Sequence, residues 1–159
     1  MRDGGGYIGI CAGGYFAAEV ITLRGQDAGE GLKLLHGEAR SPMMELVDAP
    51  IYGMTQVNIS DHSHPITQSE SDSLMVLYYW GPAFHLFINS SVSILASYHR
   101  NGLPAMVAFT YGSGRVFLSG PHPEIEEDDS RDGVSSYDEL EDEGSDWELM
   151  RKATQWVRQ

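Results

Sequence analysis

The single cysteine of the chain lies in the pattern Gly9-Ile10-Cys11-Ala12-Gly13, with a glycine two residues away on either side. Such a turn between a strand and a helix holds a nucleophile in a strained, exposed position, because glycines remove the clashes that side chains would cause. The start of the helix favours a thiolate, and the Ala12 amide is placed to stabilise an oxyanion. The pattern indicates a cysteine nucleophile, with a buried structural cysteine in a glycine-rich turn as the alternative.

His122 and Glu124 are the candidate partners of this cysteine, and they follow a predicted strand at residues 116–118. Because they are two residues apart, their side chains point to the same side of an extended backbone, and Pro123 holds His122 extended. A carboxylate beside an imidazole fixes its tautomer and stabilises the imidazolium, as a set of nucleophile, base and orienting group requires. The alternative is that both are ordinary loop residues at the start of an acidic run.

Two longer stretches, GGGYIGICAGGYFA and YGSGRVFLSGPHPE, resemble the class I glutamine amidotransferase-like superfamily, and more narrowly the biotin-protein ligase N-terminal-like family. The segments HPITQ, YYWGP and GSDWELMRKATQWV also fit, so the resemblance extends over essentially the whole chain. It implies a flavodoxin-like α/β sheet with flanking helices and a triad of Cys11, His122 and Glu124. The candidates for a pocket wall are Tyr15, Trp80, Gly81 and Pro82.

The sequence departs from the family pattern in two places. Glutamine amidotransferases usually carry a glutamine two residues after the last glycine of the turn, where this chain has Gly14-Tyr15-Phe16, so glutamine is not the expected substrate. Family members also carry several strands and helices before the nucleophile, whereas Met1 lies ten residues before Cys11. We therefore expect an N-terminally truncated sheet whose exposed edge is completed by self-association or by a partner chain.

The acidic character of the chain is local. The formal net charge of the 159 residues is −13, and 13 of the 23 acidic residues lie between residues 124 and 148, around an acidic loop segment at residues 125–146. A chain without a basic cluster is a poor partner for nucleic acids or for an anionic membrane surface. Because there is no signal-type segment, no long apolar run and no possible internal disulfide, we expect one cytoplasmic domain at residues 1–159, without a cofactor.

Two groups of side chains have the spacing of metal ligands. One matches a calcium-binding loop and consists of Asp128, Ser130, Asp132 and Glu139. No helix is signalled ahead of this group, so a solvated acidic loop is favoured. His62 and His64 would present two imidazoles on one side of a strand, but they lie in a proline-bounded turn with no third ligand signalled. We predict no metal centre from either group.

The elements that must position these side chains follow from hydrophobic periodicity and turn residues. A short buried strand at residues 7–10 leads into a helix at residues 12–21. A loop at residues 24–31 precedes a short strand at 32–35, and residues 37–48 are expected to be irregular. Further strands are expected at residues 51–59, 74–79, 92–98, 106–111 and 116–118, and an amphipathic closing helix at 147–157. This order favours an α/β sheet covered on both faces.

Two functions fit these observations. The leading hypothesis is a thiol-dependent amide hydrolase or acyl-transfer domain for a small substrate, in which Cys11 attacks a carbonyl, His122 moves the proton and Glu124 orients the imidazole. The alternative is a non-catalytic binding or regulatory module related to the N-terminal region of biotin-protein ligase. The reactivity of the cysteine is the property that separates them.

Overall fold

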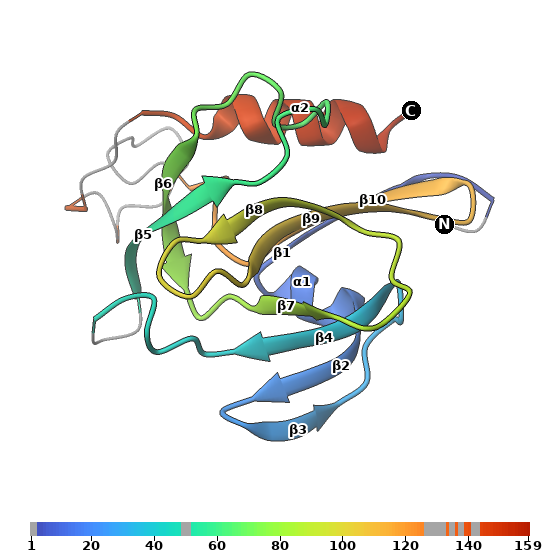
Figure 1. Cartoon of the computed structure of the whole chain (residues 1–159), viewed down its shortest axis with the longest axis horizontal. Helices are drawn as coiled ribbons and strands as arrows, with labels where there is room; N and C mark the ends of the chain where they lie inside the picture. The colour runs from blue at the N-terminus through green and yellow to red at the C-terminus, as the bar shows by residue number, and fades with distance from the viewer. Residues whose placement is uncertain (1–2, 49–51, 126–132, 134–135, 137–138, 141–143) are drawn as a thin grey trace.

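The structure is a computed structural model that describes residues 3–48, 52–125, 133, 136, 139–140 and 144–159. These residues form two sheets and two helices (Figure 1). The larger sheet contains β1 (Gly6–Ile10), β5 (Tyr52–Ile59), β6 (Ser73–Tyr79), β8 (Ser93–Tyr98), β9 (Pro104–Tyr111) and β10 (Gly114–Ser119). The smaller sheet contains β2 (Ala18–Leu23), β3 (Gln26–Gly29), β4 (Leu35–Ser41) and β7 (Ala83–Leu86). The helices are α1 (Ala12–Ala17) and α2 (Trp147–Val157).

Each sheet combines one parallel pair of strands with antiparallel neighbours. The order of the larger sheet is β1-β10-β9-β8-β5-β6, in which β1 and β10 run parallel, and that of the smaller sheet is β3-β2-β4-β7, in which β2 and β4 run parallel. The tight hairpin between β9 and β10 turns at Gly112, whose φ of 61° suits glycine. The parallel pairing of β1 with β10 brings the ends of these two strands, and the residues that follow them, to the same edge.

The larger sheet lies between α2 on one face and the smaller sheet with α1 on the other, as Figure 1 shows. Alternation along β10 explains how both faces are filled, because successive side chains of a strand point to opposite faces. Phe117 belongs to the core under α2, whereas Val116 and Leu118 belong to the core shared with the smaller sheet. All three side chains are completely buried, so β10 is a central support of the structure.

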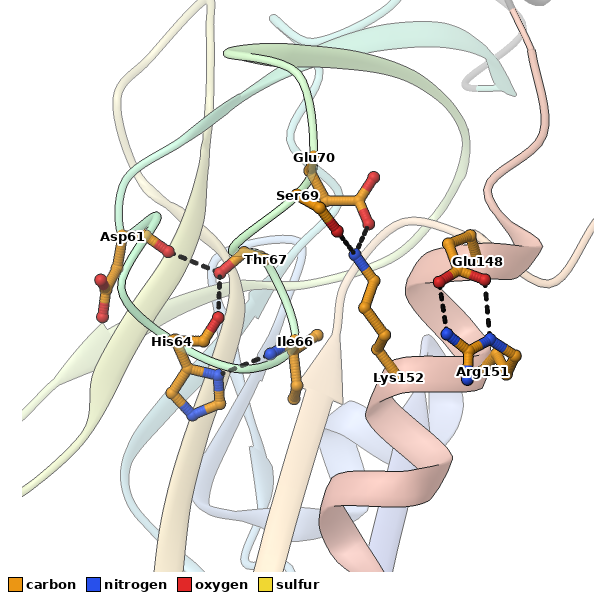
Figure 2. Close-up of polar contacts among 9 residues, drawn as sticks. All are labelled: Asp61, His64, Ile66, Thr67, Ser69, Glu70, Glu148, Arg151 and Lys152. Carbon is orange, nitrogen blue, oxygen red and sulfur yellow. Dashed lines mark hydrogen bonds and ion pairs between the residues drawn. The ribbon is translucent and has the colours of Figure 1, made fainter.

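The closing helix is confirmed at its predicted bounds, and its buried face includes a lysine. Lys152 on this helix is buried. Its Nζ donates to Ser69 Oγ at 2.9 Å and forms an ion pair with Glu70 (Figure 2). Thr154 is exposed and donates its hydroxyl to the Met150 carbonyl. The helix is therefore attached to the loop before β6 by a buried ion pair as well as by apolar packing.

The helix predicted for residues 12–21 is too long. Helix α1 ends at Ala17, and Ala18–Leu23 form strand β2. Two physical reasons account for the difference: Gly13 and Gly14 weaken the helix, and the run Val20-Ile21-Thr22 is β-branched, which favours a strand. The prediction followed the apolar spacing and gave too little weight to these propensities.

The region after β2 also contains more strand than expected. Strand β3 (Gln26–Gly29) lies within the predicted loop, and β7 (Ala83–Leu86) was not predicted. The strand predicted at residues 32–35 instead runs as β4 from Leu35 to Ser41, through residues expected to be irregular. Exposed Gln26 and Asp27 give β3 no apolar signal, while alternate buried positions along β4 are occupied by small residues such as Gly37 and Ala39. Because their residues are small or polar, these strands could not be predicted from hydrophobic periodicity.

Two sequence expectations concern the acidic segment and membrane-spanning helices. Most of the acidic segment, including the candidate calcium ligands Asp128, Ser130 and Asp132, lies outside the described residues, and Glu139 is exposed. Within the described chain, no helix has the length and apolar character needed to cross a membrane.

Candidate active site

Cys11 lies in the turn between β1 and α1, in a conformation that is unusual for a residue with a side chain. Its φ of 48° and ψ of −103° fall outside the regions that non-glycine residues ordinarily adopt, at a cost of about 1–3 kcal/mol. The backbone amide of Cys11 donates to the carbonyl of Ser119, the last residue of β10, at 2.9 Å. The parallel strand pair thus holds the turn in place and presents the cysteine at the edge of the sheet.

The glycines around Cys11 contribute unequally to this turn. A Cβ atom on Gly9 would lie 2.6 Å from the Gly13 carbonyl oxygen, so position 9 requires glycine. A Cβ on Gly13 would meet only the Tyr7 hydroxyl, at 3.7 Å, which is ordinary contact. The tight second position is Gly14, where a Cβ would lie 3.1 Å from the Phe84 ring. The expectation that Gly13 removes a clash is therefore corrected to Gly14, which is packed against β7.

His122 and Glu124 follow β10 and are connected to each other as their spacing predicts. His122 Nδ1 and Glu124 Oε1 are 2.8 Å apart. The His122 backbone amide donates to the Leu77 carbonyl on β6 at 2.8 Å, and the Glu124 carbonyl accepts a hydrogen bond from Trp147 Nε1 at the start of α2. Strand β6 and helix α2 therefore fix the positions of the imidazole and the carboxylate.

The electrostatic surroundings of His122 favour its protonated form. Burial lowers the pKa of the imidazole, but the interactions with the Cys11 thiol and with the Glu124 carboxylate outweigh this effect and raise the pKa to about 10. The His122 side chain is only 14% exposed, so solvent screens these interactions weakly. At neutral pH the imidazole is therefore a cation beside the thiol.

The thiol group itself points to a backbone acceptor. Cys11 Sγ donates to the Tyr79 carbonyl, at the end of β6, at 3.4 Å. Within the described part of the chain, His122 Nε2 is buried and has no hydrogen-bond partner. The imidazole nitrogen that faces the thiol thus remains available for proton transfer, while the other nitrogen is occupied by Glu124.

The four residues suggested for a pocket wall lie next to this arrangement. Tyr15 donates its hydroxyl to the carbonyl of Trp80 at 2.6 Å, and burial raises the pKa of Tyr15, which keeps the phenol neutral. A Cβ on Gly81 would lie 1.8 Å from the Gly120 carbonyl oxygen, so the backbone before Pro82 passes directly against the backbone before His122. This close crossing positions the turn after β6 against the turn after β10.

The turn with two histidines has a structural explanation. His64 packs its ring against Trp156 at 4.9 Å, and its Nδ1 accepts a hydrogen bond from the Ile66 amide (Figure 2). The other histidine, His62, places its Nε2 atom 3.2 Å from Asp72 Oδ1. No group of three or more side chains suited to hold a metal occurs among the described residues.

Sequence reasoning missed the main-chain groups that complete the site. The Tyr79 carbonyl receives the thiol, and the Leu77 carbonyl receives the His122 amide, although both belong to a strand 43 or more positions before His122 in the sequence. No residue type marks a carbonyl group as functional, so no signal in the sequence could have identified them. Trp147, in contrast, is a large aromatic residue at a predicted helix start and could have suggested an anchor.

Comparison with known families identifies the fold to which this site belongs. A family model described as "Biotin-protein ligase, N terminal" matches residues 1–155. The chain belongs to this family. No curated protein matches the chain. The resemblance inferred from the cysteine and histidine motifs is therefore confirmed at the level of the family.

Solved structures similar to this biotin-protein ligase N-terminal family member share its fold. A ThuA-like protein from Bacteroides uniformis has a TM-score of 0.55 at 17% identity and covers 99% of this chain. A cytoplasmic protein from Salmonella typhimurium has a TM-score of 0.52 at 13% identity and also covers 99%. A glutamine amidotransferase has a TM-score of 0.46 at 19% identity and covers 73%. The two structures with TM-scores above 0.5 show that the chain has the α/β fold of the ThuA-like protein and the Salmonella protein, in keeping with the α/β sheet that the resemblance implied.

The family member described here is shorter than these solved chains. It spans 60% of the ThuA-like chain, 57% of the Salmonella chain and 51% of the glutamine amidotransferase chain. At identities of 13 to 19%, the likeness shows the fold and not the activity. The chemistry of this chain must therefore be argued from its own residues.

Proposed function

We propose that this chain is a thiol-dependent amide hydrolase or acyl-transfer domain acting on a small substrate. Cys11 is the nucleophile, His122 transfers the proton and Glu124 orients the imidazole. The observation that carries the proposal is the connected set of a strained cysteine, an imidazole raised in pKa by that cysteine, and a carboxylate 2.8 Å from the far nitrogen of the imidazole. These groups come from two sequence segments, with a separation of 111 positions between Cys11 and His122, and meet at one sheet edge.

The proposed reaction proceeds through a thioester. The proton of the Cys11 thiol first passes to His122 Nε2, which leaves a thiolate beside an imidazolium. The Cys11 sulfur then attacks the carbonyl carbon of an amide, a C–S bond forms as the carbonyl π bond breaks, and the oxygen becomes an oxyanion facing the Ala12 amide. His122 Nε2 then gives its proton to the amide nitrogen as the C–N bond breaks and the amine leaves. In the second half, His122 takes a proton from water, which attacks the thioester, and the C–S bond breaks to release the acid and restore the thiolate.

Alkylation of Cys11 tests this proposal directly, because the chain has one cysteine and every labelled molecule reports on it. The rate of reaction with iodoacetamide is measured from pH 5 to 9 in the natural chain and in His122→Ala. We expect the natural chain to react roughly tenfold faster near pH 6, where only a stabilised thiolate is present. Glu124→Gln should give an intermediate rate, because the imidazole is retained without its orienting carboxylate.

The matched control is His99→Ala, since His99 is an exposed histidine whose ring contacts Asn58 on the larger sheet. This variant should keep the profile of the natural chain. Circular dichroism spectra verify that each variant is folded. Identical alkylation profiles in the natural chain and in folded His122→Ala would refute the catalytic proposal and favour the non-catalytic binding module.

A further inference from the structure

A cavity of about 520 Å³ lies between the turn after β2 and the segment after β4. Its lining residues include two arginines, Arg24 and Arg40, together with Pro42, Met43 and Met44. None of the described residues that line it is acidic. The chain as a whole has a net charge of −13, whereas the lining of this cavity contains basic and apolar residues.

A short series of contacts connects the cavity to the Cys11 thiol. Ser41, which lines the cavity, donates its hydroxyl to the carbonyl of Trp80 at 2.8 Å. The preceding carbonyl, that of Tyr79, accepts the hydrogen bond from Cys11 Sγ. These two contacts join the cavity wall to the sulfur through two consecutive carbonyl groups of the main chain.

The two arginines are held at the cavity by different partners. Arg40 Nη2 and Nε donate to the two carboxylate oxygens of Glu38 at 2.8 and 3.3 Å, which fixes the guanidinium group. Arg24 lies over the ring of Trp80, 4.9 Å from its centroid, and its backbone amide donates to the Ser41 carbonyl. No carboxylate among the described residues pairs with Arg24. Its positive charge is therefore positioned by an aromatic ring and remains available to an anion.

We propose that this cavity is the substrate subsite of Cys11 and that it takes an apolar acyl chain ending in a carboxylate. The methionines and the proline contact the apolar chain, and Arg24 binds the carboxylate, because a guanidinium group matches the geometry of that anion. Arg40, already paired with Glu38, adds a second positive group at the same wall. This inference rests on the proposed function, since it names the class of substrate for the same nucleophile.

Two thiol-reactive probes of equal length test the proposal. Bromoacetyl-aminohexanoic acid carries a carboxylate at the end of an apolar linker, and its methyl amide is the neutral counterpart. In both, the Cys11 sulfur displaces bromide, so that a C–S bond forms as the C–Br bond breaks. We expect the anionic probe to react roughly tenfold faster than the neutral probe at low salt, because the carboxylate binds at Arg24.

Substitutions show which residue causes the faster reaction of the anionic probe. In Arg24→Gln, the ratio of the anionic to the neutral rate should fall close to one. The matched control is Arg100→Gln, which removes an exposed arginine in the turn between β8 and β9 that donates to the Glu45 carbonyl and does not line the cavity. This variant should keep the ratio of the natural chain. Shortening the linker to bromoacetyl-glycine should also reduce the ratio, because the carboxylate then cannot reach Arg24.

The outcomes separate the two proposals. A ratio near one in the natural chain, with both rates still falling in His122→Ala, would overturn the subsite and leave the proposed function in place. A preference that survives in Arg24→Gln would also overturn the subsite. If neither rate depended on His122, the proposed function would fail, and the subsite assigned to it would fail with it.

Discussion

Replacing His122 by glutamine should change how the stability of the protein depends on pH. In the folded chain the pKa of His122 is about 10, compared with 6.5 for an ordinary histidine. Since one unit of pKa corresponds to about 1.4 kcal/mol, the protonated imidazole stabilises the fold by at most about 5 kcal/mol. The partners responsible are the Cys11 thiol and the Glu124 carboxylate, which oppose the effect of burial.

The sign of the effect follows from the direction of the pKa shift. The folded state holds the proton more tightly than the unfolded state, so the stabilisation is fully present below pH 6.5 and is lost as the pH rises towards 10. Carboxylates remain ionised across this window and do not contribute to the slope. Buried Tyr78 and Tyr98 have raised pKa values, but they are common to both chains and cancel in the difference.

Urea unfolding at half-unit steps from pH 6 to 10, under reducing conditions, measures this difference. The free energy of unfolding of the natural chain minus that of His122→Gln should decrease steadily across the window. Cys11→Ser, which removes one of the two stabilising partners, should shift the loss of stability to lower pH. A difference that stays constant from pH 6 to 10 would refute the raised pKa of His122 and the electrostatic contact with the thiol.

Three further experiments test other parts of the structure. Gly9→Ala should destabilise the chain by more than about 2 kcal/mol because its Cβ would overlap the Gly13 carbonyl, whereas Gly13→Ala should be neutral or stabilising by up to about 1 kcal/mol, as urea unfolding would show. Equal losses would contradict the unequal packing. Lys152→Met should lower the free energy of unfolding by about 3–5 kcal/mol, because it leaves the Glu70 carboxylate without its partner. Adding Glu70→Leu should recover most of this loss. If the second change did not restore stability, the buried ion pair would not be the cause of the loss. Within the described residues β1 has a hydrogen-bonded neighbour on one side only, so light scattering should detect self-association as concentration rises, and a constant monomer mass would contradict this expectation.

Local patterns in the sequence carried much of the information needed to find the site. Glycines beside Cys11 indicated the turn, and the two-residue spacing of His122 and Glu124 indicated a pair on the same side of the chain. The closing helix had strong apolar periodicity and was found at its observed bounds, 147–157. Each of these features depends on interactions between residues that are close in sequence, which is why a pattern could identify them.

Other features depend on tertiary contacts and left no such pattern. Lys152 is a residue type that is rarely buried, and only the proximity of Glu70 and Ser69 in the folded chain makes its burial favourable. Polar strand β3 is stabilised by pairing with β2 rather than by an apolar face of its own. The contact between β6 and His122 joins backbone groups, which every residue possesses.

That contact has a mechanical consequence for the site. In the order of the larger sheet, β6 is the strand farthest from β1, yet it reaches the segment after β10 through the Leu77–His122 bridge and accepts the Cys11 thiol at Tyr79. Strand β6 therefore holds the two ends of the larger sheet together at the site. Local unfolding of β6 would break both contacts and separate the nucleophile from the base in one event. The reactivity of Cys11 should therefore report on how often β6 detaches from the site. Amide hydrogen exchange at His122 would record the same opening.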